Sequence, residues 1–176
     1  IREELAPWGW PKDEFTDNGN FPHQLYVREA RRLRGAFVMK EENLRREARV
    51  DAGHPVGIGS YALDSHVVST FVDTDGHVRL EGAHLVSQSI RPYGISYYAL
   101  VPQKSECRNL LVPICLSATH VAYTSIRMEP VYMVLGQAAG AAAALAIDRR
   151  VAVQDISYPQ LQAVLTAGGQ DLTIPP

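Results

Sequence analysis

The sequence predicts a mixed α/β (α+β) fold with a hairpin-rich middle and two C-terminal helices. β-Branched and aromatic residues flank an Asp-Gly turn at 74–76, which is a strong hairpin signal. An uncharged stretch rich in helix formers covers 131–147, and a second apolar stripe follows between Ser157 and Gly168. The 176 residues suffice for one medium domain or two small lobes.

The composition is that of a folded protein without a basic bias. Hydrophobic residues make up 46% and charged residues 20%, values that exclude a disordered chain. The net charge of −2 gives no reason to expect nucleic acid as a partner. Cys107 and Cys115 are too few for a disulfide framework and lack metal-site spacing. No signal segment follows Ile1, so we expect the start to be a processed end or an internal cut in a longer chain. The compartment of this soluble protein stays open between cytoplasm and periplasm.

The N-terminal part predicts a loop followed by a short helix. Proline, asparagine and glycine punctuate residues 1–21, which predicts irregular structure. Residues 25–34 predict a helix that ends at Gly35. Eight of the 17 basic residues fall within 28–49 among glutamates, a pattern typical of a solvated face. The alternative is that one or two of these arginines contact an anionic ligand.

The middle of the chain predicts strands. Residues 67–72 and 77–80 form the two arms of the predicted hairpin. Residues 85–86 with Ile90 predict a third strand, and residues 95–101 predict a further one.

The C-terminal half predicts a strand–loop–helix unit over 110–147. Residues 110–112 predict a short buried strand, 117–127 a polar loop, and Pro130 the first turn of a helix. A helix N-terminus that follows a polar loop is the kind of unit that holds an anionic cofactor group.

The helix predicted at 131–147 is at the short limit for crossing a bilayer and is rich in alanine and glycine. We therefore expect a buried helix and no membrane contact. Gly136 and Gly140 lie four residues apart, and each is about 1 kcal/mol less favourable than alanine in a helix interior. We expect another backbone or a flat ligand to lie against them.

Several segments resemble the FAD-dependent oxidoreductase family, whose bacterial members are often labelled xanthan lyases. Three of them resemble its C-terminal FAD-contacting region: NLLVPICLSATH at 109–120, SIRMEP at 125–130 and MVLGQAAG at 133–140. Further similar segments are DNG at 17–19, PHQLYVREARR at 22–32, GSYALDSH at 59–66 and YYALVP at 97–102. The resemblance covers about residues 1–172.

The resemblance implies a partial flavin oxidoreductase that acts on a small polar or carbohydrate-like substrate with FAD as cofactor. It implies a β-rich substrate-lobe part at 1–91 and the C-terminal part of a Rossmann-like FAD-binding domain at 92–176. The family's N-terminal Gly-x-Gly-x-x-Gly segment is missing, since Gly57 and Gly59 match only its first part. Whether the chain retains FAD alone stays open. Where many relatives have Ala-Gly-Arg, this chain has Pro113-Ile114-Cys115, without that arginine.

By the same resemblance, the start of the helix at 130–147 points at the flavin and stabilises negative charge on its ring. The residues expected to face the cofactor are Ser117, Thr119, His120, Ser125, Ile126, Arg127, Gly136 and Gln137. The alternative is a loop that only connects two elements, with Arg127 paired to Glu129.

The catalytic candidates are Asp64, His66 and Arg28. Asp64 and His66 are two apart, so on a strand they face the same side, and a carboxylate can orient an imidazole for proton transfer. Arg28 and Arg32 lie on one face of the predicted helix and are candidates for holding an anionic substrate. The alternative is a set of ordinary surface residues. The spacing of the histidines predicts no metal site.

Other functions compete with this interpretation. A cofactor-free scaffold or binding module fits the missing glycine loop, and the label of the relatives predicts a polysaccharide lyase with His66 as base. A hydrolase using a serine with His66 and Asp64 lacks a Gly-x-Ser-x-Gly elbow. The expected partners are a small-molecule substrate and either the missing N-terminal segment, a companion chain or a second copy that covers exposed apolar surface.

Overall fold

The computed structural model describes residues 2–5, 9, 11–24, 27–45, 50–82 and 90–174. The chain forms two compact units, residues 1–30 and 31–176. The first unit holds helix α1 (Arg2–Leu5) and the 3₁₀ helix η1 (Thr16–Asn18), and is otherwise irregular where described, as its turn residues predict.

The prediction of a helix at 25–34 is wrong for the described residues 27–34, which form no helix. The main chain of this region bonds to distant segments instead. The Leu33 amide donates to the Cys115 carbonyl, Gly35 bridges Pro102, and the Ala36 amide donates to the Val101 carbonyl. Because these groups are used in tertiary contacts, they are not available for helical bonds. No helix therefore places Arg28 and Arg32 on a common face.

The core of the second unit contains a two-stranded antiparallel sheet of β1 (Pro55–Gly59) and β4 (Tyr93–Ser96). Every residue of β4 is buried. The strand predicted at 95–101 is confirmed only for its first two residues, because the chain turns into the 3₁₀ helix η3 (Tyr97–Ala99). The Tyr97 hydroxyl donates to the Val153 carbonyl at 2.7 Å, which fixes this turn in the core. The division at residue 91 stays a prediction.

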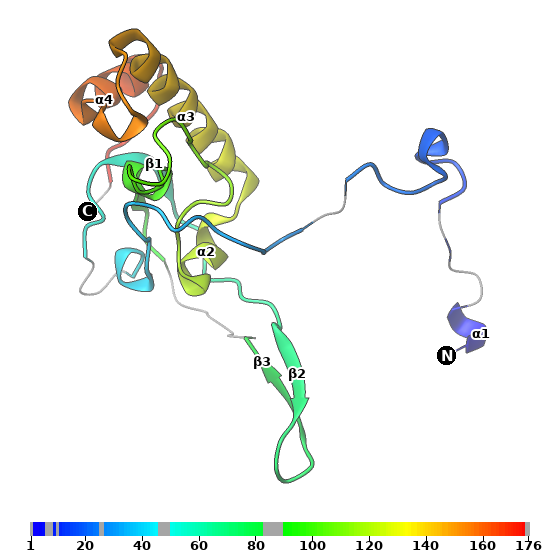
Figure 1. The fold of residues 1–176 in the computed structure, drawn as a ribbon. Coiled ribbons are helices and arrows are strands. Elements are labelled where there is room, and N and C mark those ends of the chain that lie inside the picture. Colours follow the sequence, from blue (N-terminus) through cyan, green and yellow to red (C-terminus); the bar gives the residue numbers. More distant parts are fainter. Residues whose placement is uncertain are drawn as a thin grey trace. The chain divides into compact units, whose positions relative to one another are not determined.

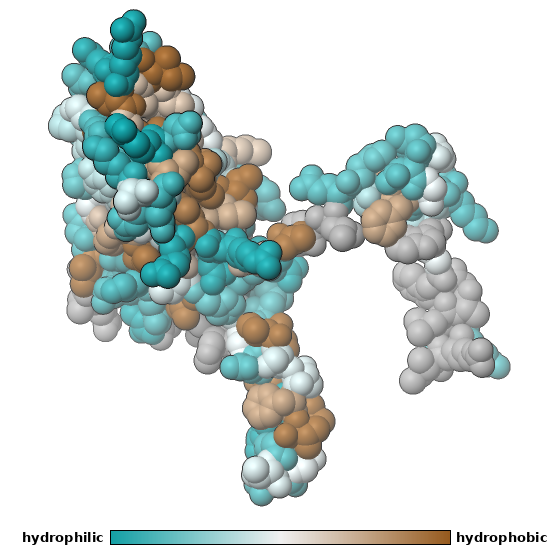
Figure 2. Space-filling model, viewed as in Figure 1, coloured by the Kyte–Doolittle hydropathy of each residue, from teal (hydrophilic) through white to brown (hydrophobic). Residues whose placement is uncertain are grey.

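A second antiparallel pair forms the predicted hairpin, which is confirmed. Strand β2 (Ser69–Val72) pairs with β3 (Val78–Glu81), and the Asp73 carboxylate closes the turn by accepting the His77 amide and the Arg79 guanidinium. These bonds, the first above all, lower the pKa of Asp73. Apolar side chains on both strands are exposed (Figure 2). Of the predicted third strand, 85–86 lies outside the described residues and Ile90 is not in a strand.

Four further helical elements complete the second unit after residue 110. They are α2 (His120–Ile126), α3 (Glu129–Arg149), η4 (Val153–Asp155) and α4 (Tyr158–Ala167), and η2 (Glu41–Asn43) precedes them in the chain (Figure 1). The two predicted C-terminal helices are confirmed. The prediction of a polar loop at 117–127 is wrong, because α2 occupies most of this stretch. Thr119 caps the helix by accepting a hydrogen bond from the Ala122 amide. The buried strand at 110–112 is also wrong, since these residues are irregular and partly or fully exposed.

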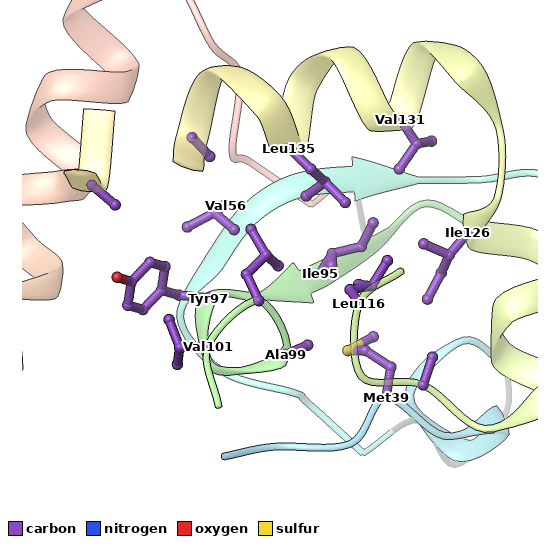
Figure 3. Packing of buried hydrophobic residues seen from close by; sticks show 14 of the residues in the cluster. Met39, Val56, Ile95, Tyr97, Ala99, Val101, Leu116, Ile126, Val131 and Leu135 are labelled. Carbon is purple, nitrogen blue, oxygen red and sulfur yellow. The ribbon is translucent and has the colours of Figure 1, made fainter. Parts of the chain in front are cut away.

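Helix α3 packs on the β1–β4 sheet along one face only. Val131 and Leu135 point toward Val56 of β1 and Ile95 of β4, with Leu116 beyond the sheet (Figure 3). The helix predicted to be buried therefore has one buried face and one exposed face. Among the helices described, α3 is the one long and apolar enough to span a membrane, a test that core helices also pass.

The expectation that Gly136 and Gly140 pack against another backbone is not met by the described residues. Both glycines are exposed, and an added Cβ at either would meet nothing within 4 Å. The small side chains leave this face of α3 smooth, while the leucine and alanine side chains on the opposite face carry the packing.

The buried face of α3 predicts unequal effects of two truncations on one helix. Leu135→Ala should lower the free energy of unfolding by about 2–5 kcal/mol, because it leaves a cavity beneath a fully buried side chain. Met133→Ala, at a side chain that is 74% exposed, should change it by about 0.5 kcal/mol or less. Urea unfolding measures both, and equal losses would contradict this packing.

Candidate functional site

A cavity of about 350 Å³ lies between the end of β1 and the first turns of α3. Its size is within the range of small-molecule sites. The lining is mostly apolar and comprises Ile58, Ser60, Tyr61, Met128, Pro130, Val131 and Val134. Two chain segments, 58–61 and 128–134, therefore build the candidate site.

The N-terminus of α3 borders this cavity without a side-chain cap. Met128 occupies the N-cap position in an extended conformation and makes no capping hydrogen bond through its side chain. Pro130 follows in the first turn, where a missing amide proton costs nothing. The positive end of the dipole of this 21-residue helix therefore lies at the cavity, where the carboxylate of Glu129 in the first turn already balances part of it.

The side chain of Arg127 stands beside this helix start and is only 4% exposed. Its Nη2 donates to the main-chain carbonyl of Asp64 at 2.6 Å and lies 3.4 Å from the carboxylate of the same residue. A buried cation is tolerated when it is paired and hydrogen-bonded in this way. Arg127 therefore links the segment that follows β1 to the junction of α2 and α3 through these contacts.

Asp64 and His66 contact each other, although the strand on which their spacing argument rested is absent from this described segment. His66 Nε2 lies 3.5 Å from Asp64 Oδ2, and both side chains are about half exposed. The pair lies on an irregular segment rather than a strand, apart from a single bridge at Asp64. The carboxylate of Asp64 thus lies between a buried guanidinium and an accessible imidazole, an arrangement that suits proton transfer, although neither residue is part of the cavity lining.

Ser65 links a second imidazole to the same segment. Its hydroxyl donates to the main-chain carbonyl of Gly82 and lies 3.3 Å from His120 Nε2. His120 is the first residue of α2, and Thr119 caps that helix. The structure therefore brings His120 and His66 to one short segment, a proximity that the sequence distance of 54 residues did not reveal.

Three of the residues expected to face the cofactor lie in the core. Ser117 and Ile126 are fully buried, and Ser125 is buried with its hydroxyl bonded to the Tyr61 main-chain carbonyl and, at 2.7 Å, to the Tyr93 hydroxyl. Desolvation raises the pKa of Tyr93, and the bond to Ser125 opposes this shift. Ser125 thus positions Tyr61 on the wall of the cavity.

Three further expected residues, Gly136, Gln137 and Arg28, do not lie in the lining of the cavity. Gly136 and Gln137 lie on the exposed face of α3, beyond the first turns that line the cavity. Arg28 is exposed in the first unit. Their roles stay predictions.

Sequence reasoning missed the apolar walls of the cavity, above all Ile58, Met128 and Val134. Met128 and Val134 belong to the SIRMEP and MVLGQAAG segments that carry the family resemblance, whereas no local signal distinguishes Ile58 from an ordinary core position. Tyr61 and Ser60 could have been found, since they belong to the GSYALDSH segment that carries the family resemblance.

A family model described as FAD dependent oxidoreductase matches residues 1–165. The chain belongs to this family. The membership makes it a flavin oxidoreductase in general terms and implies FAD as its cofactor. Searches of curated proteins and of solved structures found no match. The apolar cavity and the helix start that borders it are the features of this chain that could receive part of FAD, and Arg127 directly precedes the lining residue Met128 in the chain.

The link between Arg127 and Asp64 predicts an asymmetry between two variants of this flavin oxidoreductase. Arg127→Met should lower the free energy of unfolding by about 1.5–3 kcal/mol, because it leaves a buried carbonyl without its charged donor. Asp64→Asn should cost about 1 kcal/mol or less, because the side chain is half exposed and the main-chain bond persists. Chemical unfolding measures both, and a larger loss for Asp64→Asn would contradict the stated geometry.

Proposed function

We propose that this chain supplies the flavin-ring site of an FAD-dependent oxidoreductase that oxidises a small polar or carbohydrate-like substrate. The observation that carries the proposal is the cavity at the uncapped start of α3 with Arg127 beside it. When bound, FAD supplies the hydride acceptor. The residues of the chain orient the flavin ring, stabilise negative charge near it and accept a proton from the substrate.

The cavity walls orient the ring and keep water away from it. Ile58, Val131 and Val134 provide apolar contact, while Ser60 and Tyr61 add polar groups at the rim. The amide groups in the first turn of α3 stabilise negative charge that develops nearby. Arg127 adds a fixed positive charge, which the carboxylate of Asp64 reduces in part.

His66 is proposed as the group that takes a proton from a substrate hydroxyl. Its Nε2 is directed at Asp64, so Nδ1 is the ring nitrogen left to accept the proton. The Asp64 carboxylate then stabilises the imidazolium that forms. The imidazole is half exposed, so it can release the proton to solvent afterwards.

A further segment is proposed to complete the FAD site, either from a longer chain, from a companion chain or from a second copy. The sequence contains no Gly-x-Gly-x-x-Gly loop for the pyrophosphate. The outer face of α3 carries Met133 and Ile147, both 74% exposed, beside Gly136 and Gly140. A smooth apolar surface of this kind is suited to cover by another element.

An FAD titration of the purified chain tests the proposal, followed by visible absorption and by quenching of flavin fluorescence. Binding should be saturable, and Val134→Trp should weaken it by about tenfold or more because the larger side chain fills the cavity. The matched control is Met133→Trp, one residue away on the exposed face, which should leave the cavity open.

Equal effects of the two tryptophans would contradict the assignment of the cavity. A chain that stays colourless under all conditions would favour the cofactor-free scaffold. Cleavage of a polysaccharide without any change in flavin absorption would favour the lyase.

A further inference from the structure

A second depression lies at the opposite end of α3, between the loop 103–109 and residues 150–152. Its volume is about 680 Å³, and its lining includes Lys104, Ser105, Arg108, Asn109 and Arg150. We call this depression the C-terminal groove. A 21-residue helix is about 30 Å long, so the groove is separate from the cavity at the start of α3.

The loop that forms one wall of the groove is held in place by side chains from η4. The Gln154 amide donates to the Pro102 carbonyl at 3.0 Å and to the Cys107 carbonyl at 2.8 Å. The Val153 amide donates to the Arg108 carbonyl, and Lys104 Nζ lies 2.6 Å from the Asp155 carboxylate. These contacts fix the main chain of the loop, which lowers part of the entropic cost of binding.

The groove presents two guanidinium groups whose charge is not neutralised locally. Within the described part of the chain, neither Arg108 nor Arg150 has an ion-pair partner, whereas Lys104 is paired with Asp155. Glu106 contributes the acidic side chain of the lining. Ser105 and Asn109 add neutral hydrogen-bonding groups beside the arginines.

Arg150 ends α3 in the left-handed conformation with which helices commonly terminate, and its amide donates to the Ala146 and Ile147 carbonyls. Its φ of 55° and ψ of 43° put it in the left-handed region, where helices usually have glycine. A non-glycine residue there costs about 1–2 kcal/mol. Arg149 already places a cation in the last turn of α3, so the helix dipole has a favourable partner without Arg150. What Arg150 adds is its guanidinium at the groove.

We propose that the C-terminal groove binds the phosphate or carboxylate group of a small polar molecule. Arg108 and Arg150 hold the oxyanion, as guanidinium groups do with planar or tetrahedral oxygen sets. Ser105 and Asn109 contact the neutral polar part of the ligand. This site does not depend on the flavin, so its test is independent of the test of the proposed function.

Calorimetric titration of the full chain at low salt tests the proposal with four probes: inorganic phosphate, glucose 6-phosphate, glucuronate and uncharged glucose. At least one anionic probe should bind, and glucose should bind more weakly than it. Arg150→Gly and Arg108→Gln should each weaken that binding by about tenfold or more. Arg149→Gln, outside the lining, is the matched charge control and should leave the affinity within about twofold.

Arg150→Gly also separates binding from folding, because glycine relieves the backbone strain and should keep or raise the melting temperature. Tighter binding of glucose 6-phosphate than of glucuronate identifies a phosphate ligand, and the reverse order identifies a carboxylate ligand. No binding of any anionic probe, equal binding of glucose, or an equal loss in Arg149→Gln would overturn the proposal.

Discussion

The site depends on one interaction, the contact of the buried Arg127 guanidinium with the half-exposed Asp64. Arg127 is the last residue before the turn into α3, and Asp64 belongs to the segment that leaves β1. Their hydrogen bond fixes the distance between these two segments, and the cavity lies between them. The same contact leaves a carboxylate beside His66, so one interaction sets both the shape of the cavity and the environment of the proposed proton acceptor.

The buried face of α3 supports this arrangement from the other side. Leu135 and Val131 pack on the β1–β4 sheet, which aims the start of the helix at the cavity. Ser125 holds the Tyr61 carbonyl and the Tyr93 hydroxyl together beneath the wall. A backbone approach at Gly59 completes the packing, because a Cβ there would lie 2.6 Å from the Tyr93 ring. Apolar packing therefore positions the helix, and a few polar contacts place the neighbouring loop.

Local sequence patterns correctly predicted the elements that are stabilised mainly by residues close together in the sequence. The hairpin around residues 74–76 and the two C-terminal helices carry turn, cap and periodicity signals within a few residues, and they are confirmed. The predictions failed where tertiary contacts override local preference. Residues 27–34 have a helical pattern, but the Leu33 amide bonds to the distant Cys115 carbonyl, and Thr119 within the polar stretch 117–127 caps a helix. Asp64 and His66 are close in the sequence and contact each other, whereas the contact of Asp64 with Arg127 spans 63 residues and has no local signal.

The central claim is that the flavin lies in the cavity between the end of β1 and the start of α3. Amide hydrogen exchange measured by mass spectrometry, with and without FAD, tests it most directly. The account predicts that FAD slows exchange in peptides covering 58–66 and 127–134, while the hairpin at 69–81 exchanges as before. Protection confined to the hairpin or to the exposed far turns of α3, with no change in those two peptides, would contradict it.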